Sequence, residues 1–199
     1  MASQIHMAEG LVTTYVVNAG KSRFQVKATA GGVLSAFGHN PTIAIRSFTG
    51  EVWFRLQAPE QSSLRIEIDA ASLEVANDVK AHDRQEMDRA MKEEVLETRS
   101  YPQIGFEGNA AQANKITDGM YRITLAGKLT LHGVEKVLQF PCNVTVSEDS
   151  MRANGEFSIR QTDYGIQLVS VAGGALKLKD ELKFSFDIVA HRTREADNA

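Results

Sequence analysis

The strongest constraint on the fold is an alternation of apolar and polar residues that recurs along most of the chain. Phe24, Val26 and Ala28, for example, alternate with Gln25 and Lys27. Successive side chains of a β-strand point to opposite faces, so this pattern predicts strands with one buried face. The alternating segments are 24–30, 52–56, 64–68, 121–125, 138–146, 157–159 and 182–188.

Short clusters of turn-forming residues separate these segments. They lie at 18–20, 31–32, 114–119 and 154–155, and each contains at least one glycine. Such clusters favour tight connections between antiparallel strands. Many short strands with a single apolar face predict an all-β antiparallel sandwich or barrel, and the pattern alone does not choose between the two.

The stretch 77–98 departs from this pattern, because it is dense in charge and its apolar residues recur at helical spacing. The spacing predicts one amphipathic helix laid across the barrel, with its charges toward solvent. Asn77 or Asp78 is expected to cap its start, and Pro102 excludes helix at the residue before it. The side chains expected to pack inward are Met87, Ala90, Met91 and Val95.

Composition excludes several classes of protein. A length of 199 residues supports one well-buried core, and 43% hydrophobic with 24% charged residues fits a globular domain better than a disordered chain. A net charge of −3 lacks the basic surface that phosphate neutralisation needs, so no nucleic-acid partner is expected. No run approaches the roughly 18 apolar residues of a transmembrane helix.

The chain is expected to hold a single domain. Residues 1–10 are expected to be a tag or disordered tail, 11–192 the barrel domain, and 193–199 a flexible tail. The first residues lack the basic segment and apolar core of a secretory signal, so a cytoplasmic location is expected, or a periplasmic one if the natural N-terminus was trimmed. The single cysteine, Cys142, lies in an apolar stretch and is expected to be a buried, inert thiol.

Three motifs carry a family resemblance. They are SYPQIGF at 100–106, GKLTLHGV at 127–134 and RQTDYGI at 160–166. All three resemble segments of the YceI-like family of polyisoprenoid-binding proteins. The segment SAFGHN at 35–40, and the helix before Tyr101, are similar to one branch of that family. The similarity runs in order from about Tyr15 to Arg192, which is most of the chain.

The resemblance implies a lipocalin-like, up-and-down antiparallel β-barrel of about eight strands with a helix packed on it. Some members of the family hold an isoprenoid chain lengthwise in an elongated apolar cavity. The implied partner is therefore an apolar isoprenoid lipid, such as a quinone or a polyprenyl chain. A bacterial protein and a homodimer are expected on the same basis. No cofactor is required beyond such a lipid, and no metal is expected.

The candidate ligand-binding residues lie in these motifs or on the apolar stripes: Phe37, His39, Trp53, Phe106, His132, Phe157, Arg160 and Tyr164. The two histidines would meet a head group at the cavity mouth, or would bond to the backbone and fix a turn. The planar fork of the arginine suits a phosphate, or it would pair with Asp163 and pin the turn before Gly165. The cluster of His82, Asp83 and Glu86 is expected to be a solvated helix face.

These observations favour a non-catalytic carrier of a long apolar lipid. Burial of apolar surface is worth about 25 cal/mol per Å², so a polyprenyl tail can bind without any polar contact. One alternative is an enzyme, such as an esterase or isomerase, that acts on an apolar substrate in the same cavity. It would need an acid–base pair with perturbed pKa values, which no motif shows. A second alternative is a barrel filled by side chains, with a structural or stress-related role.

Overall fold

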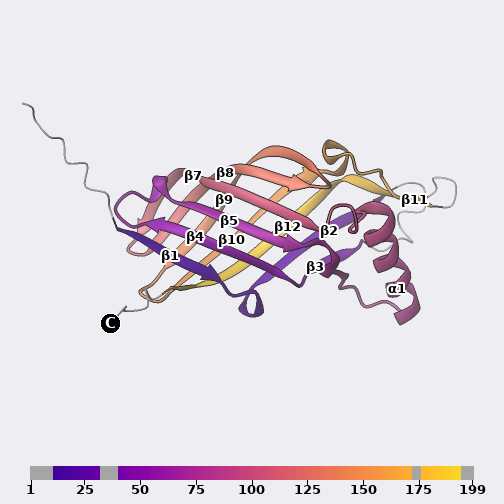
Figure 1. Ribbon diagram of the computed structural model, residues 1–199, viewed down its shortest axis with the longest axis horizontal. Coiled ribbons are helices and arrows are strands. Elements are labelled where there is room, and N and C mark those ends of the chain that lie inside the picture. Colours follow the sequence, from indigo (N-terminus) through magenta and orange to yellow (C-terminus); the bar gives the residue numbers. More distant parts are fainter. Residues whose placement is uncertain (1–10, 32–39, 172–175, 194–199) are drawn as a thin grey trace, which may run out of the picture.

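Eight antiparallel strands wrap into a closed barrel in the computed structural model, which describes residues 11–31, 40–171 and 176–193. The barrel strands are β1 (Val12–Val17), β4 (Phe48–Arg55), β5 (Ser63–Asp69), β7 (Gln103–Thr117), β8 (Met120–Leu131), β9 (Val134–Val146), β10 (Ser150–Arg160) and β12 (Leu176–Arg192). Each pairs with the next, and β12 returns to β1, where Tyr15 lies opposite Arg192 (Figure 1). This order confirms the predicted up-and-down barrel.

Three further strands continue the sheet from β12, in the order β2 (Arg23–Gly31), β3 (Thr42–Ile45) and β6 (Leu73–Val75). A fourth, β11 (Ser170–Val171), pairs with the start of β12. Short 3₁₀ turns connect strands at Ala19–Lys21, Pro59–Gln61, Ala70–Ser72 and Gln161–Tyr164. Thr193 follows the last strand, and its backbone N–H donates to the Thr14 carbonyl at 2.9 Å.

The predicted strands exist, but two turn assignments were wrong. Asn154 and Gly155 lie inside β10, and the turn before it is closed by Ser147 N–H donating to the Ser150 carbonyl at 2.8 Å. A Cβ at Gly155 would lie 2.8 Å from Phe186 Cζ, so glycine gives room for this aromatic ring. Likewise, β7 runs on to Thr117, and the turn is confined to 118–119.

One predicted inward residue, Leu56, points out instead. The strand β4 ends at Arg55, so the alternation stops one residue earlier than predicted, and Leu56 is 55% exposed. Sequence patterning also missed β7 as a strand of 15 residues. Its inward positions include Gly108 and Ala110, which carry little apolar signal.

The predicted helix is present and shorter than 77–98. The α-helix α1 spans Ala81–Ala90 and continues as one π-helical segment, Met91–Val95, at one end of the barrel (Figure 1). Asn77 does not cap it, because its Oδ1 accepts from Thr42 N–H at 2.6 Å and thereby ties the chain to β3. Lys80 precedes the helix without a side-chain cap. No helix within the described ranges is long and apolar enough to cross a membrane.

Candidate ligand-binding cavity

The inward faces of the strands enclose a cavity of about 700 Å³. It extends from Ser62, at the end of the barrel where β4 and β5 are joined, to Met91 under the helical segment. Its wall is almost entirely aliphatic and aromatic. The described barrel is therefore hollow, and the alternative of a core filled by side chains does not hold.

Phenylalanine side chains form much of the wall. The ring of Phe157 is stacked between those of Phe140 and Phe184, at centroid distances of 4.5 Å and 4.7 Å. Phe106 lies on the other side of Phe140, 5.6 Å away, and Phe186 contacts both Phe140 and Phe157. All five line the cavity. The strands β7, β9, β10 and β12 thus present a group of aromatic rings in mutual contact to any occupant.

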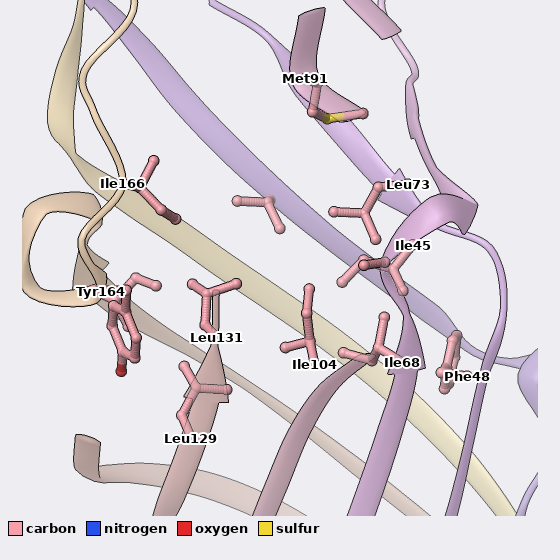
Figure 2. Packing of buried hydrophobic residues seen from close by; sticks show 13 residues of the cluster. Ile45, Phe48, Ile68, Leu73, Met91, Ile104, Leu129, Leu131, Tyr164 and Ile166 are labelled. Carbon is pink, nitrogen blue, oxygen red and sulfur yellow. The ribbon is translucent and has the colours of Figure 1, made fainter. Parts of the chain in front are cut away.

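The two ends of the barrel differ in how they are closed. At the end that holds the start of β1, Tyr15, Phe54 and Tyr121 belong to one packed cluster, in which the last two rings lie 5.5 Å apart. At the opposite end the helical segment places Met91 over the strands. Figure 2 shows Met91 above Leu73 and Leu131, and the three side chains belong to one apolar cluster.

Few contacts hold α1 to the barrel. None of its residues is buried, and the following segment contributes Met91, which is 9% exposed. Asp88 Oδ1 accepts from Val75 N–H at 2.8 Å, and Arg84 Nη2 donates to the Asn77 carbonyl at 3.0 Å. The four residues predicted to pack inward, Met87, Ala90, Met91 and Val95, all line the cavity, but so do Glu86 and Arg89, which were expected to face solvent.

Two polar side chains on the wall are almost fully buried. Ser62 is 5% exposed, and its Oγ accepts from Arg55 N–H at 3.0 Å. Gln161 is 3% exposed, and its Nε2 donates to the Lys179 carbonyl at 3.0 Å. Gln161 is the first residue of the turn in the RQTDYGI motif, and its polar side chain carries no sequence signal that marks it as part of the cavity wall.

Burial raises the pKa of two ionisable groups in and beside the cavity. Cys142 lines the wall, and desolvation raises its pKa from 9.0 to about 12, so the thiol stays protonated. Tyr164 is buried behind the wall, and desolvation raises its pKa to about 12. Its hydroxyl is sealed from solvent and has no hydrogen-bond partner within the described residues. Neither group is ionised near neutral pH.

The sequence-derived candidates do not all reach the cavity. Phe106 and Phe157 line it. Trp53 does not, because its strand neighbours Val52 and Phe54 face inward and the alternation places Trp53 on the outer surface. Arg160 is exposed at the end of β10, where its neighbour Ile159 faces inward. Phe37 and His39 lie outside the described residues.

His132 and Tyr164 lie behind the wall, where the three sequence motifs meet. His132 and Gly133 have φ values of 51° and 73° and form the two-residue turn between β8 and β9. The His132 ring lies 4.3 Å from that of Tyr101, and its Nδ1 lies 3.3 Å from the Tyr164 carbonyl oxygen. These contacts match the alternative in which the histidine fixes a turn.

The turn after Arg160 is held by Asp180, and not by the ion pair between Arg160 and Asp163 that was one of the two expectations. Asp180 accepts hydrogen bonds from Thr162 N–H at 2.9 Å and from Thr162 Oγ1 at 2.7 Å. The backbone hydrogen bond from Thr162 is the largest cause of a lowered pKa at Asp180. No ion pair between Arg160 and Asp163 occurs among the described contacts. The arginine is therefore not needed to pin the turn.

Solved structures share this fold. Burkholderia cenocepacia BcnA is 19% identical, with a TM-score of 0.65, and the match covers 87% of this chain and 98% of that one. A polyisoprenoid binding domain from Saccharophagus degradans, implicated in plant cell wall breakdown, is 15% identical, with a TM-score of 0.65 and coverage of 90% and 98%. A Campylobacter jejuni YCEI protein is 16% identical, with a TM-score of 0.56 and coverage of 76% and 85%.

No curated protein sequence matches the chain. The YceI-like domain, by contrast, matches residues 15–190, which include all eight strands of the barrel apart from their outermost ends. This range holds the three motifs that meet at His132. The chain belongs to the YceI-like family.

Proposed function

We propose that this protein binds a long apolar isoprenoid lipid, with a quinone or polyprenyl chain, inside the barrel and without catalysis. The observation that carries the proposal is the continuous apolar cavity of about 700 Å³. Pockets for small ligands have volumes of about 300–1,000 Å³. Burial of apolar ligand surface at about 25 cal/mol per Å² supplies affinity without polar contacts.

The comparisons support the same class of ligand. The Saccharophagus degradans domain is described as polyisoprenoid binding, and its fold is shared over 90% of this chain. The raised pKa of Cys142 also favours binding over covalent catalysis, because a protonated thiol is a poor nucleophile.

The proposal includes a homodimer. The outer face of β1 exposes Val12 by 41% and Val16 by 39%. Trp53 lies next to them on β4, opposite Thr14. An apolar group of this kind on the outside of a barrel suits contact with a second copy. Sedimentation of the wild type and of Val16→Lys tests this part, since the variant is expected to shift mass toward the monomer.

The test of lipid binding has two steps. Purified protein is extracted with organic solvent and the extract is examined by mass spectrometry, where an isoprenoid lipid is expected. The delipidated protein is then titrated with a fluorescent polyprenyl analogue. Ala28→Phe fills part of the cavity, because Ala28 lines it and is 2% exposed, so binding should weaken.

The matched control is Ala126→Phe. Ala126 faces outward on β8, between Asn109 and Gln139, and does not line the cavity. It should bind the analogue like the wild type. Equal binding by both variants, or no saturable binding by the wild type, would remove the proposed function.

A further inference from the structure

Gln161 combines deep burial with an incomplete set of hydrogen bonds. It is 3% exposed and lines the cavity at the end that α1 covers. Ile159 and Leu182, which lie opposite each other on β10 and β12, and Ile166 surround this part of the wall with apolar side chains. A carboxamide in such surroundings needs a specific polar partner.

The orientation of the amide is determined by its one partner. The Lys179 carbonyl is an acceptor, so the group 3.0 Å from it must be Nε2, and this leaves Oε1 on the opposite side. Among the described residues, no donor bonds to Oε1. Oε1 is not one of the described side-chain atoms that are both sealed from solvent and unpartnered, so it is accessible from the cavity that Gln161 lines and can accept a hydrogen bond from a donor on the ligand.

The charges on the wall also restrict the ligand. Arg89 of α1 lines the cavity, and its Nη1 already contacts Glu93 Oε2 at 3.2 Å and Glu94 Oε1 at 3.0 Å. Glu86, on the same helix, adds a negative charge. The described wall thus supplies no unpaired cation for a phosphate, and burial of an uncompensated anion is strongly unfavourable.

We propose that Gln161 selects isoprenoid ligands that carry a neutral hydroxyl group, which donates a hydrogen bond to Oε1. This inference rests on the proposed function and narrows its ligand to an alcohol or a hydroquinone. It also orients the ligand. The hydroxyl lies at the α1 end, and the apolar tail extends past the stacked ring of Phe157 toward Phe54.

The test uses three probes with the same tail: geranylgeraniol, its methyl ether and geranylgeranyl phosphate. The ether keeps the oxygen but lacks the O–H donor. The delipidated wild type should bind the alcohol about three- to tenfold more tightly than the ether, as expected for one neutral hydrogen bond. In Gln161→Leu this preference should disappear. The phosphate should bind no more tightly than the alcohol.

Two controls locate the effect. Gln139→Leu makes the same change on the exposed outer face of β9 and should keep the preference. Ser62→Ala removes the buried hydroxyl at the opposite end of the cavity and should also keep it. Loss of the preference in Ser62→Ala, with retention in Gln161→Leu, would overturn the assigned orientation and the role of Gln161.

The wild type decides the matter even if Gln161→Leu does not fold. Equal affinity for alcohol and ether, or tightest binding of the phosphate with a steep salt dependence, would overturn the inference while leaving lipid binding intact. Failure of all three probes to bind would instead remove the proposed function, and the inference with it.

Discussion

His132 Nε2 lies 2.8 Å from Glu97 Oε2, and this contact joins the two non-glycine residues with positive φ in the described chain. Glu97 follows the helical segment, and His132 forms the β8–β9 turn. The other ring nitrogen faces the Tyr164 carbonyl. Both partners are acceptors, so the ring donates through an N–H group that faces one of them. The histidine therefore ties together the end of the helical segment, the β8–β9 turn and the turn after β10.

Replacing His132 with Asn should remove the ring contacts to Glu97 and Tyr164 while keeping the β8–β9 turn. Asn followed by Gly is well suited to a turn with two positive φ values, so the hairpin is retained while the ring contacts are lost. We expect a loss of about 1–2 kcal/mol in the free energy of unfolding, measured by urea denaturation. A double-mutant cycle with Glu97→Gln should give a non-zero coupling energy. Unchanged stability of His132→Asn would show that the tie contributes nothing.

Ligand binding should depend on burial more than on surface charge. Phe157→Ala removes roughly 100 Å² of apolar contact, which at about 25 cal/mol per Å² weakens binding of a polyprenyl analogue by almost two decades. Arg160→Gln should change binding little, because Arg160 is exposed and does not line the cavity. Phe157→Leu, a milder truncation, should fall between them. Titrations at low and high salt test this order, and a large salt-dependent loss for Arg160→Gln would reverse it.

The docking of the helical segment should fail when its buried side chain is charged. Met91→Asp places a carboxylate where Met91 is 9% exposed among apolar neighbours, which should cost a few kcal/mol and lower the melting temperature by several degrees. Gln85→Asp introduces the same side chain at an exposed position of α1 and should melt near the wild type. Equal melting of the two variants would mean that the segment does not pack on the barrel in solution.

Cys142 should make the protein less stable in alkaline solution. Burial raises its pKa from 9.0 to about 12, so above pH 9 the unfolded thiol ionises while the folded one does not. The unfolded state then binds fewer protons, and stability falls by about 1.4 kcal/mol by pH 10. Cys142→Val should lose less stability than the wild type between pH 8 and pH 10, by urea denaturation at each pH. Parallel curves for the two proteins would contradict the raised pKa.

The sequence by itself determined most strands, the existence of the helix and the inward direction of Phe157. These features depend on local periodicity, because a buried face imposes apolar residues at the spacing of the element. The three motifs were also sufficient to identify the family. What the motifs do, however, depended on contacts between residues far apart in the chain, such as that of His132 with Glu97.

The tertiary structure alone decided that the barrel closes through β1 and β12 and that its interior is hollow. Patterning cannot distinguish residues that fill a core from residues that line a cavity, because both are apolar and both alternate. It also cannot place residues where the alternation is interrupted. Trp53 was a candidate ligand-binding residue but lies outside, on the polar side of the alternation, whereas Gln161 carries no apolar signal and lies on the cavity wall. The position of Gln161 follows from the turn at the end of β10, which is set by pairing across the whole sheet.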